Sequence, residues 1–211
     1  RDGKARRISV RNLPSFVDRL DLPLDVPGVG RLTVDTAYGG DSFVMVDAAT
    51  LGFTHTPDEA HAMARLGVAI TRAADDQLGF THPGNPEWRH FSFCLFAGPL
   101  TRVADGWETR HAVAIRPGKI DRSPTGTAVS ARLAVLAARD RIGPGEVLRA
   151  RSLIGGQVEG RIVGTARVGD RPAVLPEISG RAWITGIHQH LLDPEDPWPT
   201  GYRLSDTWGA R

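Results

Sequence analysis

The order of apolar and polar residues along the chain predicts a strand-rich fold with two long helices. Residues 6–11 alternate between polar and apolar side chains, as a half-buried strand does. Residues 31–37 alternate again, and residues 42–46 follow the glycine pair Gly39-Gly40, so these two segments are predicted to form a hairpin bent at the glycines. The same signals predict further strands at residues 91–97, 111–115, 152–154, 161–167 and 182–187.

Both predicted helices have recognisable starts. Thr56-Pro57-Asp58-Glu59 combines a capping residue, an early proline and two acids, and the apolar residues after it recur at helical spacing as far as about Leu78. A second helix is predicted from about Thr127 to Arg139. Strands on both sides of each helix favour an α+β fold in which a curved sheet wraps around a helix, and the stretch from residue 193 to 211 is predicted to be irregular.

Composition narrows the class of protein. Hydrophobic residues make up 41% of the 211 positions and charged residues 24%, which is ordinary for a globular chain. No apolar run approaches the ~20 residues that a membrane helix needs, so no membrane partner is expected. The net charge of +2 comes from scattered arginines, which does not favour a nucleic-acid surface. A single cysteine, Cys94, excludes an internal disulfide and fits a reducing, cytoplasmic setting.

The densest group of candidate chemical residues lies between Gly118 and Arg132, where a loop runs into the second predicted helix. The first amides of that helix, at Gly126 and Thr127, have no partners within the helix, and such a terminus binds a carboxylate or phosphate well. Asp121 lies a few residues upstream and is suited to a cation. Together these groups would bind a zwitterion. A capped helix with a purely structural aspartate explains the same spacing.

Several segments resemble the proline racemase family. Asp121-Arg122-Ser123-Pro124-Thr125-Gly126-Thr127, followed by Ser130-Ala131-Arg132-Leu133-Ala134, resembles the second active-site motif of that family. The segments 12–16, 38–47 and 178–186 resemble other parts of the family in the expected order. The family contains proline racemases, 4-hydroxyproline epimerases and trans-3-hydroxy-L-proline dehydratases.

The resemblance implies a fold like that of diaminopimelate epimerase, with two α/β lobes, each wrapping strands around a helix, and the active site between them. It implies a small-molecule substrate and no cofactor or metal, and it leaves a homodimer as an open option. On this basis residues 1–30 are expected to be a remnant of the N-terminal lobe, residues 31–190 the C-terminal lobe, and residues 191–211 a tail. The first residue is not Met, and we expect the chain to be a fragment of a longer enzyme that carries the catalytic cysteine.

The residue at position 125 departs from the racemase pattern. Racemases of the family use one cysteine on each face of the α-carbon, and this chain has Thr125 where the second cysteine is expected. The family branch with threonine resembles trans-3-hydroxy-L-proline dehydratase, in which one base removes the α-proton and the 3-hydroxyl leaves. That reaction is the leading hypothesis. The alternatives are a 4-hydroxyproline epimerase or proline racemase, and an inactive lobe that binds proline.

Other residues carry weaker signals. By a loose resemblance to epimerases of the family, His90 is a candidate for substrate contact. Ala128 replaces the usual glycine of the motif and would add a methyl group beside the carboxylate site. Cys94 lies in an apolar strand and is predicted to be a core residue rather than a catalytic one. His188 and His190 share one face of a predicted strand but are interpreted as exposed side chains, not metal ligands.

Overall fold

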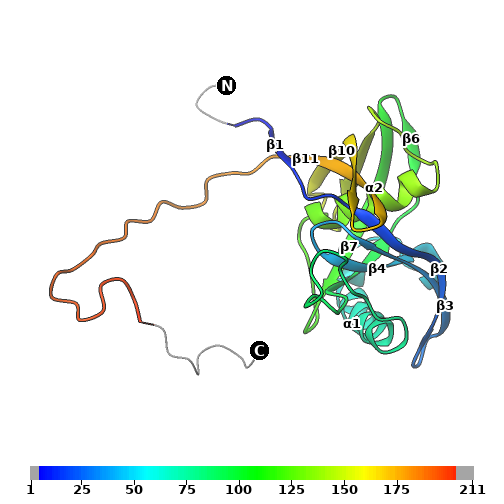
Figure 1. Cartoon of the computed structure of the whole chain (residues 1–211), viewed down its shortest axis with the longest axis horizontal. Helices are drawn as coiled ribbons and strands as arrows, with labels where there is room; N and C mark the ends of the chain where they lie inside the picture. The colour runs from blue at the N-terminus through cyan, green and yellow to red at the C-terminus, as the bar shows by residue number, and fades with distance from the viewer. Residues whose placement is uncertain (1–4, 203–211) are drawn as a thin grey trace. The chain divides into compact units, whose positions relative to one another are not determined.

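The computed structural model describes residues 5–202 of the chain. Contacts divide the chain into a compact unit that ends at Arg181 and a second unit that begins at Ala182 (Figure 1). The compact unit holds every helix and strand of the described residues. Within those residues no helix is both long and apolar enough to cross a membrane.

The compact unit is built on one large sheet of eleven strands. Its main path runs in the order β1-β11-β10-β9-β7-β5-β4-β3-β2, while β6 and β8 pair with β7 at the side. Most neighbours are antiparallel, and the pairs β4–β5 and β7–β9 are parallel. The strands are β1 (Ile8–Arg11), β2 (Phe16–Val26), β3 (Gly30–Tyr38), β4 (Ser42–Asp47), β5 (Phe93–Ala97), β6 (Thr101–Val103), β7 (Gly106–Ile115), β8 (Lys119–Ile120), β9 (Val147–Arg151), β10 (Gln157–Val168) and β11 (Arg171–Gly180).

The sheet curves until its two ends meet. Ser15, just before β2, forms a bridge with Val174 of β11, and both backbone hydrogen bonds of that bridge are present. Arg171 of β11 strengthens the seam, because its guanidinium pairs with the Asp18 carboxylate at 2.9 Å and donates to the backbone oxygen of Asp18 at 2.7 Å. The seam therefore ties the first long strand to the last one.

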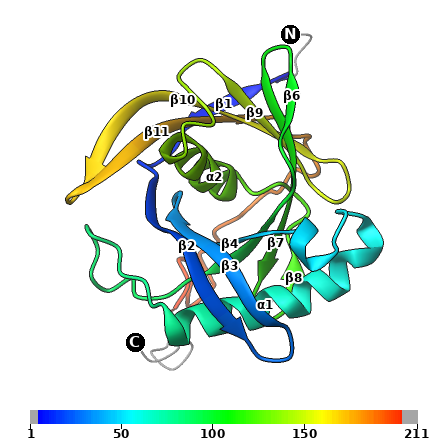
Figure 2. The same cartoon turned by 90° about the vertical axis from the view of Figure 1, so that its right-hand side faces the viewer.

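Two helices occupy opposite faces of this curved sheet. Helix α2 (Gly126–Ala138) lies inside the curve, against strands β2, β3, β9, β10 and β11 (Figure 2). Helix α1 (Ala60–Gln77) follows the short helix η2 (Pro57–Glu59) and packs outside, against β5, β7 and β8. Thr56 and Glu59 form a capping box at the start of η2. The remaining short helix is η1 (Ala49–Leu51).

Alternation along the central strands fills both cores. In β4, Phe43 and Met45 pack with α2, whereas Val44 and Val46 belong to the core shared with α1. This period of two is what a sheet covered on both faces requires. Cys94 of β5 is fully buried on the α1 side, which confirms its prediction as a core residue.

The structure corrects two predicted strands and adds five that were not predicted, namely β2, β6, β8, β9 and β11. Residues 152–154 form a turn after β9, and residues 182–187 form no strand. The strand β11, at residues 171–180, was not predicted, because Pro172 and Pro176 interrupt its pattern. Pro176 is tolerated beside a bulge, where the register of β10 against β11 shifts.

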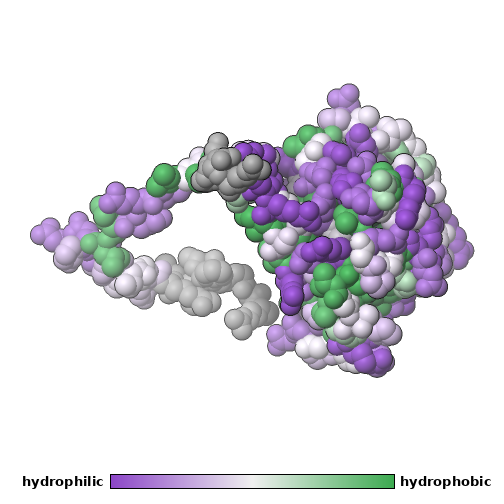
Figure 3. All heavy atoms as spheres, turned by 90° about the horizontal axis from the view of Figure 1, so that it is seen from above, coloured by the Kyte–Doolittle hydropathy of each residue, from purple (hydrophilic) through white to green (hydrophobic). Residues whose placement is uncertain are grey.

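Strands β1 and β2 pair within the same sheet as the later strands. The assignment of residues 1–30 to a remnant of the N-terminal lobe stays a prediction. The described part of the second unit, residues 182–202, has no helix or strand, and large apolar side chains are exposed along it (Figure 3). They include Trp183, Ile184 and Ile187.

Candidate functional site

The residues that the motif singled out meet at one mouth of the curved sheet, around the N-terminus of α2. The parallel strands β4 and β5 begin at this mouth, and β7 ends there, since Phe93 pairs with Ile115. The loop after β7 and β8 leads through Asp121 into Gly126, the first residue of α2. The topology thus brings the loop, the helix terminus and the turn before β4 to the same edge.

Asp121 organises the loop that precedes α2. Its Oδ1 accepts a hydrogen bond from the Ser123 amide at 2.9 Å. Its Oδ2 accepts hydrogen bonds from the hydroxyls of Ser123 at 3.1 Å and Thr125 at 2.6 Å. A carboxylate can accept about four hydrogen bonds, so one acceptor position remains for an external cation. The local structural role of Asp121 and a ligand-binding role are therefore compatible.

Thr125 holds an unusual backbone conformation at the start of the helix. Its φ is +63° and its ψ is 106°, outside the regions that a β-branched residue ordinarily adopts. Such strain concentrates at sites where the surrounding structure dictates the geometry. Thr125 forms no side-chain cap on α2, because its hydroxyl is turned to Asp121 instead.

The helix terminus consequently offers free donors. The amides of Gly126 and Thr127 have no carbonyl partner within the helix, and the helix dipole adds partial positive charge at this end. Both residues are only partly buried. A carboxylate placed here would receive hydrogen bonds from the amides while Asp121 stood a few residues away.

The glycine turn between β3 and β4 packs directly on the first turn of α2. A Cβ atom at Gly39 would come within 2.2 Å of the Thr127 carbonyl oxygen, so only glycine fits. Asn12 fixes the contact, because its amide donates to the Gly39 carbonyl at 2.9 Å and to the Ser130 hydroxyl at 2.8 Å. The turn thereby sets the position of the helix terminus. The family resemblance already pointed to these glycines, but the supporting role of Asn12 was missed.

His90 lies just before β5, at the same mouth. Its side chain is exposed and stacks on Trp88, with the ring centroids 5.9 Å apart. Its backbone oxygen accepts a hydrogen bond from Ser42 at the start of β4. No contact joins His90 to Asp121 or Thr125, so its role at the site stays a prediction.

Ala128 does not face the site as the sequence suggested. Its side chain is fully buried in the core that α2 shares with Phe43 and Leu95. The extra methyl group is therefore accommodated by the core rather than by the helix terminus.

Burial raises the pKa of the Cys94 thiol, which makes the thiolate inaccessible.

The sequence analysis did not identify a buried histidine, His111, that lies near Pro124 in the loop before α2. His111 of β7 is fully buried, and neither ring nitrogen has a well-formed hydrogen bond. Burial lowers the pKa of His111 to about 3, with a further lowering by the positive charge of Arg132. The Pro124 carbonyl opposes this shift, but at a geometry too poor for a good hydrogen bond. The imidazole is therefore neutral at physiological pH.

No cluster of three or more potential metal ligands occurs among residues 5–202. His188 and His190 are exposed in the second unit, with ring centroids 6.5 Å apart. Neither histidine is proposed as a functional residue.

Comparison with known proteins gives a consistent match. Residues 1–203 match the proline racemase family. The chain is similar to the structure of a hydroxyproline epimerase from Agrobacterium vitis with bound trans-4-hydroxy-L-proline, at 36% identity and a TM-score of 0.81, covering 100% of this chain and 59% of that one. It is also similar to a probable proline racemase from Agrobacterium radiobacter K84 with bound carbonate, at 34% identity and a TM-score of 0.81, covering 100% of this chain and 61% of that one. The chain thus spans about three fifths of the length of these two proteins.

Proposed function

Because the chain belongs to the proline racemase family, we propose that it forms part of an enzyme that removes the α-proton of hydroxyproline or proline. The observation that carries the proposal is the position of Asp121 beside the uncapped N-terminus of α2. An imino acid of this class is a zwitterion. It needs one site for its carboxylate and another for its ring ammonium, and this loop supplies both.

In the proposed complex the substrate carboxylate accepts hydrogen bonds from the amides of Gly126 and Thr127. The ring ammonium donates to the remaining acceptor position on Asp121. Holding the carboxylate at a positive helix end also stabilises the charge that spreads onto it when the α-proton leaves. Cys94 is buried and cannot serve as the base, so the base is proposed to come from another part of the longer protein.

Epimerisation or racemisation is the first candidate for the overall reaction. The two similar structures are a hydroxyproline epimerase and a probable proline racemase, and they support this alternative better than they support dehydration. The reaction inverts the α-carbon: one group takes the proton from one face, and a second group returns a proton to the other face. In this chain the second group would have to act through or near Thr125.

Dehydration of trans-3-hydroxy-L-proline is the second candidate, and Thr125 is the observation that favours it. A threonine hydroxyl is a much weaker acid than a thiol, whose pKa is about 8.5, so it returns a proton to a carbanion poorly. The carbanion can instead expel the neighbouring 3-hydroxyl with one proton as water, which leaves a pyrroline-2-carboxylate. Because the Thr125 hydroxyl donates to Asp121, its oxygen is free to accept a hydrogen bond from the substrate.

Product analysis tests the proposal and separates the two reactions. Full-length enzyme is incubated in turn with trans-4-hydroxy-L-proline, L-proline and trans-3-hydroxy-L-proline, and products are followed by NMR and chiral chromatography. Formation of cis-4-hydroxy-D-proline or D-proline identifies an isomerase, and a pyrroline-2-carboxylate from the 3-hydroxy substrate identifies a dehydratase. Thr125→Cys should raise inversion of the α-carbon in either case. Failure to convert any of the three substrates contradicts the proposed function.

A further inference from the structure

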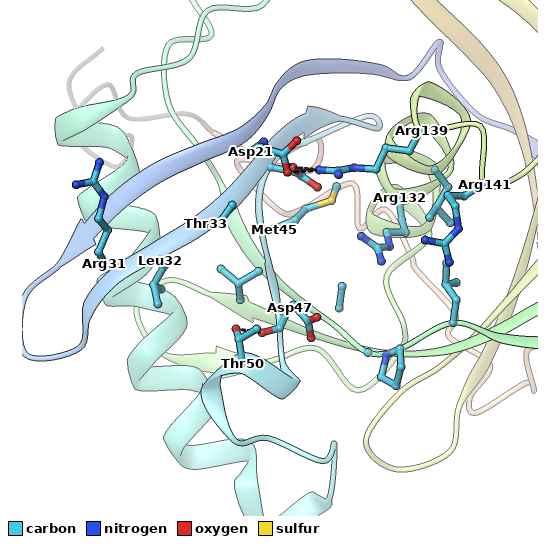
Figure 4. A pocket seen from close by; sticks show the side chains of 17 residues that line it. Asp21, Arg31, Leu32, Thr33, Met45, Asp47, Thr50, Arg132, Arg139 and Arg141 are labelled. Atoms are coloured by element: carbon cyan, nitrogen blue, oxygen red, sulfur yellow. Dashed lines mark hydrogen bonds and ion pairs between the residues drawn. The ribbon is translucent and has the colours of Figure 1, made fainter.

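A cavity of about 610 Å³ lies at the mouth of the curved sheet opposite to Asp121. The C-terminal half of α2 forms one wall, and the end of β4, the end of β5 and the start of β3 form the others (Figure 4). The same strands that begin at the candidate site therefore end at this cavity. Nothing in the proposed reaction uses it.

The cavity wall contains a cation without a close partner. Arg132 projects from α2, and its Nε is buried with no hydrogen-bond partner. Its charge is influenced by Asp35 and Asp47, but neither carboxylate forms an ion pair with it within residues 5–202. A buried guanidinium without a direct anion is costly, because desolvation is not repaid by contact.

A second arginine adds to this positive charge. Arg141 lines the same cavity and is close enough for its charge to act on Arg132. Its guanidinium lies over the ring of Trp107, 5.9 Å from the ring centroid, and among the described residues no carboxylate pairs with it. Arg139, by contrast, is neutralised by Asp21 at 2.8 Å and Asp35 at 2.6 Å. Among the described residues, Arg132 and Arg141 are thus the two cations of the cavity wall that lack a carboxylate partner and are available to an added anion.

The rest of the lining defines the ligand more closely. Four arginines and three aspartates line the cavity, and this small excess of positive charge suits a single negative charge better than a double one. Met45, Val46, Leu100 and Leu136 contribute apolar surface next to the arginines. We propose that this cavity binds a small monocarboxylate with a short aliphatic body, whose carboxylate pairs with Arg132 and Arg141. The apolar side chains cover the body of such a ligand.

Calorimetric titration of full-length enzyme with butyrate tests the proposal. Butyrate has no ammonium group for Asp121, so the candidate substrate site does not favour it. Saturable binding is expected, and Arg132→Gln and Arg141→Gln should each weaken it by about tenfold or more, since a charge-assisted hydrogen bond is worth about 1.5–3 kcal/mol. Because Arg141 is exposed, its variant remains informative even where Arg132→Gln fails to fold.

Matched controls locate the binding. Arg31→Gln removes a lining arginine that Figure 4 shows turned away from Arg132, and it should leave butyrate affinity unchanged. Butan-1-ol, which keeps the aliphatic body without the charge, and inorganic phosphate should bind at least tenfold more weakly than butyrate. The proposal is overturned if butyrate does not bind, if its affinity is unaffected by the Arg141 substitution, or if phosphate binds as tightly.

Discussion

At the scale of single residues, the site depends on which group the Thr125 hydroxyl contacts: the Asp121 carboxylate or a backbone amide of α2. A residue at a helix start usually caps the helix with its side chain, which would occupy a backbone amide. Thr125 bonds to Asp121 instead and adopts a positive φ, so the helix amides stay open while the carboxylate is held in place. The family motif pointed to these residues. The hydrogen bond between Thr125 and Asp121 depends on the folded loop, which the motif does not specify.

His111 was not predicted as a notable residue, because its segment looks like an ordinary buried strand. Its closeness to the charge of Arg132 on α2 depends on the curvature of the sheet, which sequence periodicity does not reveal. A fully buried, neutral imidazole has a consequence for acid stability. The folded protein cannot take up a proton at His111 until about pH 3, whereas the unfolded chain does so near pH 6.5.

Stability should therefore fall as the pH falls below about 6.5, because the unfolded state binds the proton that the folded state refuses. His111 contributes up to about 1.4 kcal/mol of unfolding free energy per pH unit in this window. Denaturant unfolding of the full-length enzyme between pH 6.5 and pH 5 measures the slope. His111→Leu should reduce the slope, while His61→Leu, at an exposed position on α1, should not. Equal slopes in wild type and His111→Leu would refute a neutral buried His111.

At the scale of elements, the signals that worked were local. The capping residue at Thr56 and the helical spacing after it predicted α1. The position of α2 was predicted within one residue at each end. The glycine turn gave the β3–β4 hairpin. The failures involve partners distant in sequence. Strand β11 is stabilised by β10 and β1 despite its prolines, and the predicted strand at residues 182–187 has no paired strand among the described residues.

The N-terminus of α2 is the element on which the proposed binding mode rests. Pyrrole-2-carboxylate is a planar mimic of the deprotonated substrate, so it should bind with its carboxylate about 3 Å from the amides of Gly126 and Thr127. A crystal structure of the full-length enzyme with this compound measures the position. Crystals soaked with pyrrole, which lacks the carboxylate, should show no ligand at the helix end. A carboxylate found elsewhere would remove Gly126 and Thr127 from the binding site.

At the scale of the whole molecule, the sheet encloses α2 and gives the helix two exposed ends with different chemistry. One end presents backbone amides beside Asp121, and the other meets a cavity with Arg132 and Arg141. The α+β class was predictable from the order of strands and helices. A curved sheet around a helix was also expected from that order, but its closure was not predicted, because the seam between Ser15 and Val174 joins residues far apart in the chain.

The central claim is that Asp121 and the α2 terminus hold an imino acid whose α-proton is removed. Loss of deuterium from α-deuterated L-proline, trans-3-hydroxy-L-proline and trans-4-hydroxy-L-proline tests it most directly, because racemisation, epimerisation and dehydration all break that bond. The full-length wild-type enzyme should release the α-deuterium of at least one of them into water. Asp121→Asn should fold normally and lose most of this activity. Retention of the α-deuterium by wild type with all three compounds, or near-normal release by Asp121→Asn, would contradict the account.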